Sequence, residues 1–346
     1  MTYGKEKKEM EYIFSDSLAE LRPSAIREIF KSLGDPEMIA FAAGNPSPEA
    51  FPVELVRREC GRILAEQPVT ALQYGTTEGY TPLRRAIESR LIERFGHTRD
   101  GNDVMVTTGG EQGIELACKA LCNPGDAVLC EEPSFIGALN SFRSLGAVPV
   151  GVPMDADGIN VEAFEEAAVR TGARLAYLIP TFQNPSGITM SAEKRRAVYE
   201  IACRRSIIII EDNPYGELRF AGSGVDTIKS IDREGAVIYC SSFSKILAPG
   251  IRIGFVQAPI AVISKMVVAK QVEDVHTPML TQMLAYAFMQ SGTMDEHIRS
   301  AAELYGRKCA LMLSRLDRCM PEQVSYTRPE GGLFLWCTYP ESVDIT

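Results

Sequence analysis

The segment from residue 236 to residue 255 reads AVIYCSSFSKILAPGIRIGF, and the interpretation of the whole chain starts from it. It opens with an apolar run, Ala236 to Cys240, which predicts a buried strand. Lys245 follows among serines, and Arg252 lies seven residues further on. A Schiff base to an aldehyde phosphate needs such a set, because the amine forms the imine while serine and arginine bind the phosphate. The segment alone is also compatible with a surface lysine in a serine-containing loop.

The composition is that of an ordinary folded protein. The chain has 346 residues, 45% hydrophobic and 23% charged, which predicts a full core and two domains. Its net charge of −9 argues against a nucleic-acid or anionic-membrane partner. No apolar run approaches the length of a membrane span, and the charged N-terminus does not resemble a signal peptide. Nine cysteines without a CxxC pair indicate a reduced, cytoplasmic protein. No metal site is expected, because the three histidines are too dispersed: His97, His276 and His297.

Strand-like and helix-like patterns alternate through the middle of the chain. A helical pattern at 191–204, for example, begins with Ser191 as a candidate N-cap. Continuous apolar strands separated by helices predict a mostly parallel sheet that is buried on both faces. Ligands of such sheets bind beyond the carboxyl ends of the strands. The strands are expected at 104–106, 126–130, 174–179, 206–210 and 236–240.

The two ends of the chain differ from this alternating region. A polar arm and a helical pattern at 23–33 come first, and a charged helical pattern at 294–315 and a late strand at 332–339 come last. These ends are expected to form a second, smaller domain. The predicted division is an N-terminal arm and small-domain segment at 1–45, a large domain at 46–290, and a C-terminal small domain at 291–346.

A glycine-rich turn, Thr107 to Gly113, follows the first predicted strand and opens a helical pattern. Glycines at a helix N-terminus let backbone N–H groups close on a phosphate, and the helix dipole adds to the attraction. An ordinary strand-to-helix turn has the same appearance. This segment by itself therefore leaves both interpretations open.

Further candidates lie directly after predicted strands. Phe135 is placed either to stack on a planar cofactor or to pack in the core. Asn184 can donate to a phenolic or carboxylate oxygen, although the Pro-Ser-Gly that follows it also predicts a plain turn. Asp212 closes an isoleucine-rich strand, so it should need a cationic partner such as a protonated pyridine nitrogen, unless it only caps a turn. Tyr215, three residues on, could donate to the phenolate oxygen of the same ring.

In this order the pieces resemble the class I and II aminotransferases of the fold-type I enzymes that use pyridoxal 5′-phosphate (PLP). The nearer likeness is to the branch with aromatic, 2-aminoadipate and kynurenine aminotransferases and the effector domains of MocR-type regulators. The resemblance extends from about residue 20 to the end of the chain. Four more segments match the family: FAAGNP at 41–46, LQYG at 72–75, GYTPLR at 79–84 and RPEGGLF at 328–334.

The resemblance implies roles around the cofactor ring. Lys245 would form the Schiff base with the PLP aldehyde, and Asp212 would pair with the pyridine nitrogen. Asn184 and Tyr215 would bind the 3′ oxygen of the ring, and Phe135 would stack on it. Lys245, Asp212 and Tyr215 are the catalytic residues that this likeness implies.

The resemblance also implies how the phosphate and the substrate are held. Tyr74 would reach the phosphate of a neighbouring subunit, which makes a homodimer part of the site. The Gly44 backbone and Asn184 would bind the substrate carboxylate. Many relatives have a hydroxyl where this chain has the Gly110-Glu111 pair, so here only backbone donors remain at that turn. The implied phosphate ligands within the chain are Gly110, Glu111, Ser242, Ser244 and Arg252.

The implied activity moves an amino group between an L-amino acid and a 2-oxo acid with ping-pong kinetics. The implied fold is an α/β fold-type I PLP transferase, a mostly parallel seven-stranded sheet between helices with a smaller α+β domain. Relatives usually continue beyond the position of Thr346 and carry there an arginine that binds the substrate α-carboxylate. The small domain is therefore expected to be incomplete at its C-terminus, with Arg22 and Arg27 as candidate replacements.

Two alternatives stay open on the sequence. Another fold-type I reaction, such as that of a lyase or decarboxylase, would use the same cofactor-binding residues. The second alternative is a regulatory or inactive relative that binds PLP. A regulator carries a DNA-binding domain upstream, which the short segment before residue 45 and the net charge of −9 do not favour. The identity of the substrate is not determined.

Overall fold

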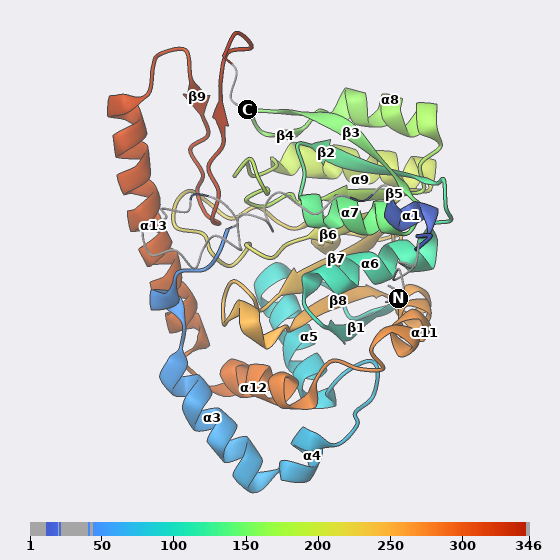
Figure 1. Ribbon diagram of the computed structural model, residues 1–346, viewed down its shortest axis with the longest axis vertical. Helices are drawn as coiled ribbons and strands as arrows, with labels where there is room; N and C mark the ends of the chain where they lie inside the picture. The colour runs from blue at the N-terminus through green and yellow to red at the C-terminus, as the bar shows by residue number, and fades with distance from the viewer. Residues whose placement is uncertain (1–11, 20, 22–40, 42–43, 344–346) are drawn as a thin grey trace, which may run out of the picture.

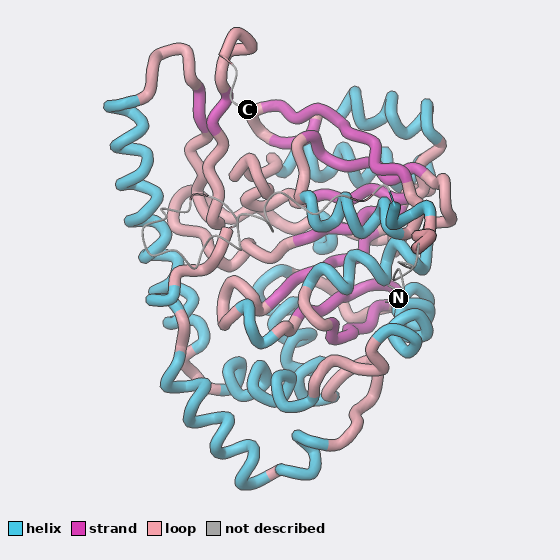
Figure 2. Tube along the Cα trace, in the orientation of Figure 1, coloured by secondary structure: helices cyan, strands magenta, loops and turns pink. Residues whose placement is uncertain are grey.

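An eight-stranded sheet forms the centre of the molecule. The computed structural model describes residues 12–19, 21, 41 and 44–343. The strand order across the sheet is β1-β8-β7-β6-β5-β2-β3-β4, and a separate hairpin pairs β9 with β10 (Figures 1 and 2). The bounds are β1 Asn102–Thr107, β2 Ala127–Glu132, β3 Val148–Asp155, β4 Gly158–Ile159, β5 Leu175–Leu178, β6 Ile208–Asp212, β7 Val237–Ser242, β8 Gly254–Pro259, β9 Ser325–Tyr326 and β10 Cys337–Thr338.

Five neighbouring strands, β7, β6, β5, β2 and β3, run parallel. β8 is antiparallel to both β7 and β1, and the short β4 pairs antiparallel with β3 at the edge. The predicted mostly parallel sheet is confirmed, with β4 as an eighth strand beyond the seven expected. All five strands expected from apolar runs are present. The apolar runs do not predict β3 and β8, because proline, glycine and glutamine interrupt these two.

Helices cover both faces of the sheet (Figure 1). Along β6, Ile209 and Ile210 point to opposite faces, since side chains alternate along a strand. Ile210 packs in a core cluster with α6, α7 and α11, and Ile209 packs in another with α8, α9 and α10. Ser191 caps α9 as predicted, because its hydroxyl accepts from the Lys194 N–H at 3.3 Å. The helices are α1 Asp16–Ala19, α3 Val53–Glu66, α4 Pro68–Leu72, α5 Thr81–Phe95, α6 Gly110–Leu121, α7 Ile136–Ser144, α8 Val161–Thr171, α9 Ala192–Arg205, α10 Ile228–Ile231, α11 Ile260–Glu273, α12 Met279–Gln290 and α13 Met294–Cys319, with 3-10 turns at Pro48–Ala50 and Pro249–Ile251.

A third core cluster fixes the backbone around Lys245. Phe243, Ile246 and Leu247 are buried against α5, α12 and α13. Burying an apolar side chain of this size contributes about 1.5–3 kcal/mol. The turn that presents Lys245 is therefore held by packing on both sides of the lysine.

The expectations for the ends of the chain have different outcomes. The charged helix expected at 294–315 is confirmed as α13, which continues to Cys319. The late strand expected at 332–339 is wrong in extent, because only β10 is regular there. Gly332 has φ +71°, and a positive φ ends an extended strand. The helical pattern at 23–33, with Arg22 and Arg27, lies outside the described residues, and the division at 1–45, 46–290 and 291–346 stays a prediction.

The cysteines and helices bear on two further expectations. All nine cysteines are free thiols. Cys118 is buried in α6, and Cys122 packs against the same core at the end of that helix. Among the helices that the structure describes, none is both long and apolar enough to cross a membrane.

Candidate functional site

Three parallel strands end side by side where the candidate residues lie. β6 ends at Asp212, β7 ends at Ser242, and the loop that follows β5 carries Asn184. β5 pairs with β6, and β6 pairs with β7. Because parallel strands present their carboxyl ends at the same edge of a sheet, the residues that follow them share one place. We call this place, with Lys245, the strand-edge site.

The Lys245 amine is partly buried in the strand-edge site. Its Nζ donates to the backbone oxygen of Gly44 at 3.0 Å and lies 5.8 Å from the centre of the Tyr215 ring. Burial and the positive charge of Arg252 lower the pKa of Lys245 to about 8, although Asp212 opposes them. A lysine with this pKa has a substantial neutral fraction near neutral pH, so its nitrogen can act as a nucleophile or a base.

Asp212 supplies a buried carboxyl group to the strand-edge site. It is 5% exposed, and the Tyr177 hydroxyl donates to its Oδ2 at 2.7 Å. Burial raises the pKa of Asp212 to about 7, and the hydrogen bond from Tyr177 acts in the opposite direction. A cation placed against this carboxyl group would favour its ionised form, because burial without a cation penalises the charge.

A tyrosine and an asparagine meet across the same site. The Asn184 Nδ2 lies 3.4 Å from the Tyr215 hydroxyl. Burial raises the pKa of Tyr215, so its hydroxyl remains protonated near neutral pH and can donate. The Phe334 ring meets the Tyr215 ring edge-on, with centres 5.7 Å apart. Phe334 also lies against Gly44, where a side chain on that glycine would collide with the ring.

Donors suited to an anion gather beside α6. The Ser242 hydroxyl donates to the Ser244 hydroxyl at 2.8 Å, and Arg252 Nη1 lies 3.5 Å from that Ser244 oxygen. Gly109 precedes α6 with φ +83° and gives the helix no side-chain cap. A Cβ at Gly109 would collide with the Arg252 guanidinium, so glycine is required for this approach. Uncapped helix N–H groups, two hydroxyls and a guanidinium together form a site for a phosphate or carboxylate.

Phe135 lies close to the start of α6. A Cβ added at Gly137 would collide with the Phe135 ring and would lie 3.0 Å from Glu111 Oε1. Phe135 and Glu111 are therefore neighbours, and the ring also packs against the core cluster that contains α6 and α7. The ring is thus placed beside the anion-binding donors, while part of its surface serves the core.

Tyr74 stands apart from this group within one chain. It is 82% exposed, and its ring meets the His276 ring edge-on at 5.7 Å. None of the hydrogen bonds among the described residues links the Tyr74 hydroxyl to Lys245 or Arg252. The structure therefore brings together the candidate cofactor residues except Tyr74, whereas Arg22 and Arg27 lie outside the described residues.

Two residues of the site have no role in the sequence interpretation. Tyr177 holds Asp212 by its hydroxyl, but within the apolar β5 it is indistinguishable from a core residue. Phe334 belongs to the matched segment at 328–334, and its place against Gly44 and Tyr215 depends on packing. The only sequence signal available for Tyr177 is its position in the strand beside β6.

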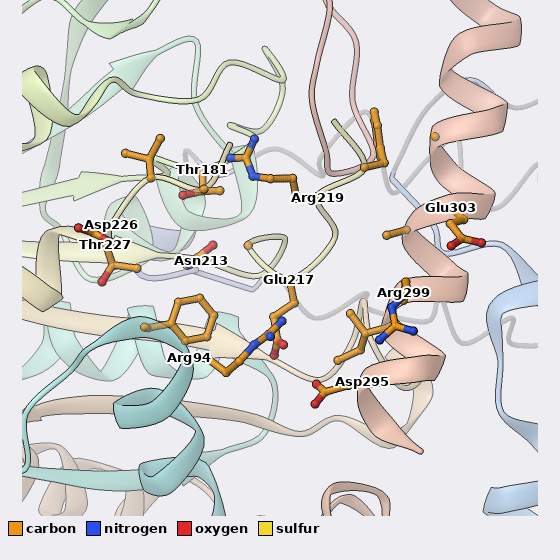
Figure 3. Close-up of a pocket in the computed structure, with 18 of the residues that line it drawn as sticks. Arg94, Thr181, Asn213, Glu217, Arg219, Asp226, Thr227, Asp295, Arg299 and Glu303 are labelled. Carbon is orange, nitrogen blue, oxygen red and sulfur yellow. The ribbon is translucent and has the colours of Figure 1, made fainter. Parts of the chain in front are cut away.

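A large cleft of about 920 Å³ lies apart from Lys245, between the loop after β6 and α13 (Figure 3). Asn213 lines this cleft, whereas the preceding Asp212 faces Tyr177, because successive side chains in a strand point to opposite sides. The cleft is therefore distinct from the strand-edge site. Charged residues of both signs border it: Arg94, Glu217, Arg219, Asp295 and Arg299.

Comparison with known proteins connects this geometry to one family. The family model described as aminotransferase class I and II matches residues 36–344. The aromatic-amino-acid aminotransferase 1 of Thermococcus litoralis is 40% identical over 339 residues, which cover 96% of this chain and 81% of that protein.

Solved structures agree with this match. The kynurenine aminotransferase of Pyrococcus horikoshii in complex with PMP has a TM-score of 0.92 and 39% identity, covering 96% of this chain and 83% of that one. LysN, the α-aminoadipate aminotransferase of Thermus thermophilus, was solved with N-(5′-phosphopyridoxyl)-L-leucine. It has a TM-score of 0.87 and 37% identity, covering 96% and 83% of the two chains.

Proposed function

The chain belongs to the class I and II aminotransferases and is a PLP-dependent aminotransferase, and we propose that the strand-edge site carries out its reaction. The reaction moves an amino group between an amino acid and a 2-oxo acid. The observation that supports the assignment of the site is a lysine of lowered pKa near a buried carboxyl group and a set of anion donors. The lysine would bind the aldehyde of the cofactor, the carboxyl group its ring nitrogen and the anion donors its phosphate.

The ring of PLP fits the groups around Asp212. A protonated pyridine nitrogen would place a cation directly against this buried carboxyl group, whose pKa is raised by burial. Asn184 and Tyr215 lie together and can both donate, so they would hold the 3′ oxygen of the ring. Phe135 would stack on the ring face. Lys245, close to Tyr215, would bond to the aldehyde.

The phosphate of PLP fits the donors beside α6. The N–H groups of Gly110 and Glu111 begin that helix without a side-chain cap. Ser242, Ser244 and Arg252 add two hydroxyls and a guanidinium. Helix N-termini and arginine are the protein's strongest partners for a phosphate, so these five residues are proposed as its ligands.

When bound, PLP supplies an aldehyde that captures amines and a ring that withdraws electrons from the substrate α-carbon. The chain supplies the proton transfers and the orientation. Lys245 Nζ would accept the proton that leaves the α-carbon, as its lowered pKa allows. Asp212 would hold a proton at the ring nitrogen, and Tyr215 would donate to the 3′ oxygen. The N–H of Gly44 and the amide of Asn184 would orient the substrate carboxylate.

Substrate candidates come from the relatives. Their names record aromatic amino acids, kynurenine and α-aminoadipate. We propose these amino acids as the first to test, with glutamate and 2-oxoglutarate as the donor and acceptor pair. Phe334, whose ring lies against Tyr215 and Gly44, is in contact with two residues of the strand-edge site, so an apolar group on the substrate would find an apolar neighbour there.

The experiment that tests the proposed function is a visible absorption spectrum of the protein with PLP, before and after addition of an amino acid. A yellow band that forms with the protein and bleaches with glutamate, or with one of the candidate substrates, would show a working half-reaction. A band that none of these amino acids changes would contradict transamination by this chain. No band would contradict the cofactor site.

The lowered pKa of Lys245 predicts how the capture of PLP by the cofactor-free protein depends on pH. The neutral amine is the reactive form, and its fraction grows as the pH rises through about 8. We expect the rate constant for capture to rise about tenfold between pH 7 and pH 9 and then to level off. Stopped-flow absorbance measures this rate. A rate that kept rising well above pH 9 would indicate an unperturbed lysine.

We also propose a homodimer in which Tyr74 serves the partner's phosphate site. Tyr74 is 82% exposed, and Val69 and Leu72 just before it are 75% and 74% exposed. Large apolar side chains that are exposed together mark an interaction surface. Within its own chain Tyr74 contacts His276 rather than the strand-edge site, which agrees with a role toward a second subunit.

Mixed dimers test this role of Tyr74. Tyr74→Phe should weaken PLP binding about tenfold, because a hydrogen bond to a charged group is lost. A dimer of one Tyr74→Phe subunit and one Lys245→Ala subunit should contain one intact site, so it should bind PLP with wild-type affinity at half the stoichiometry. Titration of the purified mixed dimer gives both values. A protein of single-chain mass in light scattering, or a Tyr74→Phe homodimer with unchanged affinity, would refute the shared site.

A further inference from the structure

Asp274 connects the end of one helix to the turn before another. It follows the last residue of α11, and its side chain reaches Thr108, just before α6. The Thr108 hydroxyl donates to Asp274 Oδ2 at 2.8 Å, and Gln112 Nε2 donates to the same oxygen at 2.9 Å. Two residues that flank the proposed phosphate turn are therefore held by one carboxylate from a separate helix.

Lys270 contacts both Asp274 and Gln112. Its side chain is fully buried, and its Nζ lies 2.8 and 2.9 Å from the two carboxylate oxygens of Asp274. The same ammonium donates to Gln112 Oε1 at 2.6 Å. A buried ammonium needs such partners, since its charge is costly without them. The pair also leaves no net negative charge from Asp274 near a site for an anion.

These contacts determine which groups the turn has left for a ligand. The Thr108 N–H is occupied by Gln112 Oε1 at 2.8 Å, and the Gly109 N–H by the Thr107 oxygen at 2.9 Å. The N–H groups at the start of α6 have no side-chain cap. The Thr108 carbonyl faces Arg252, whose Nη2 lies 3.5 Å away. The network thus holds the side chain and the N–H of Thr108, and it leaves the N–H groups at the start of α6 for an anion.

We propose that Asp274 is a positioning residue for the cofactor phosphate, which acts through Thr108 and Gln112 on the start of α6 and on Arg252. This inference rests on the proposed function of the strand-edge site. Asp274 itself would touch neither the phosphate nor the substrate. Without its carboxylate, the Thr108 hydroxyl would keep only Thr277 Oγ1 at 3.1 Å and the Gln112 amide only Glu273 Oε2 at 3.3 Å. The buried Lys270 would also lose its counter-ion, so the turn would no longer be held in one arrangement.

The test compares PLP with pyridoxal, which has the same aldehyde and ring but no phosphate. Asp274→Ala should weaken PLP binding by about tenfold to a hundredfold, because hydrogen bonds to a charged group are lost behind the phosphate turn. The same variant should change pyridoxal binding by less than about threefold, since Lys245 and Asp212 are untouched. Dissociation constants from absorbance titration of the full-length protein give both numbers. If Asp274 served only general stability, the variant would weaken the binding of PLP and of pyridoxal by the same factor.

Three further variants serve as controls. Glu273→Ala removes a neighbouring carboxylate that pairs with Lys119 and accepts from Gln112 Nε2 only at 3.3 Å, so it should weaken PLP binding far less than Asp274→Ala does. Asp274→Asn keeps an acceptor for Thr108 and should restore part of the PLP affinity. Combining Thr108→Val with Asp274→Ala should weaken PLP binding no more than Asp274→Ala alone, because residues that act through one contact are not additive. If Asp274→Ala does not fold, the same comparison of PLP with pyridoxal affinity is made with Asp274→Asn and with Thr108→Val.

The possible outcomes separate the two levels of the argument. Equal losses for PLP and pyridoxal, or no loss for either, would overturn the role of Asp274 and leave the proposed function intact. Additive losses in the double variant would overturn the path through Thr108. A wild-type protein that bound PLP no better than pyridoxal would show that the phosphate site itself is wrong, and the inference would fall with it.

Discussion

Replacing Lys245 by alanine is expected to lower kcat/KM for transamination by about 10⁴-fold or more. The amine is both the nucleophile and the proton carrier of the proposed mechanism, and its lowered pKa prepares it for both. Reduction with borohydride followed by peptide mass spectrometry should find PLP attached to the Lys245 peptide of the wild type. No peptide of the variant should carry it.

A matched lysine provides the control. Lys194 pairs with Asp155 and Asp157 away from the strand-edge site, so Lys194→Ala should leave turnover and PLP attachment unchanged. Surface ion pairs of this kind contribute little to stability, and the control variant should fold normally. If the Lys245→Ala protein still fixed PLP on a single other lysine, the assignment of Lys245 would be wrong.

The second large effect is expected at Asp212. Its replacement by alanine should lower kcat/KM by about 10²- to 10⁴-fold, while borohydride still fixes PLP on Lys245. In the proposed mechanism the carboxylate would keep a proton on the ring nitrogen, and without that proton the ring would withdraw electrons poorly from the substrate α-carbon. Asp212→Asn should behave similarly, because it keeps the shape of the side chain and removes the charge. Steady-state kinetics together with the fixation assay separate attachment from turnover.

Tyr177→Phe is the comparison that isolates the charge of Asp212. It removes only the hydroxyl that donates to Asp212 at 2.7 Å and leaves the carboxylate in place. Losing one such hydrogen bond should cost about tenfold in kcat/KM or less. Near-normal turnover in Asp212→Ala, or an equal loss in both variants, would count against the role assigned to the carboxylate.

Much of the fold and most of the site were predictable from local patterns. The isoleucine run before Asp212 and the apolar run before Lys245 can be buried only as strands between helices, and helices between consecutive strands make those strands parallel. The carboxyl ends of parallel strands lie at one edge, so Asn184, Asp212 and Lys245 had to meet. The order of residue types along the chain then identified the cofactor by its resemblance to one family.

Other features depended on packing between segments far apart in the sequence. The Lys245 amine meets the Gly44 carbonyl across 201 residues, and Thr108 meets Asp274 across 166. The local pattern of apolar and polar residues predicts neither contact. The segment after Gly332 is apolar enough to predict a long strand, yet Gly332 has a positive φ and Phe334 lies against Tyr215 in an irregular backbone.

The sequence by itself thus determined the class of sheet, the edge at which the site lies and the chemical groups that gather there. Hydrophobic periodicity and the type of residue at a strand end decide those features, and both are local. The tertiary structure alone decided that Tyr177 donates to Asp212, that Asp274 accepts from the turn before α6, and that the Tyr74 ring contacts His276. A hydrogen bond forms only within a few tenths of an ångström of its ideal length, and that accuracy comes from strand register and helix packing across the whole molecule.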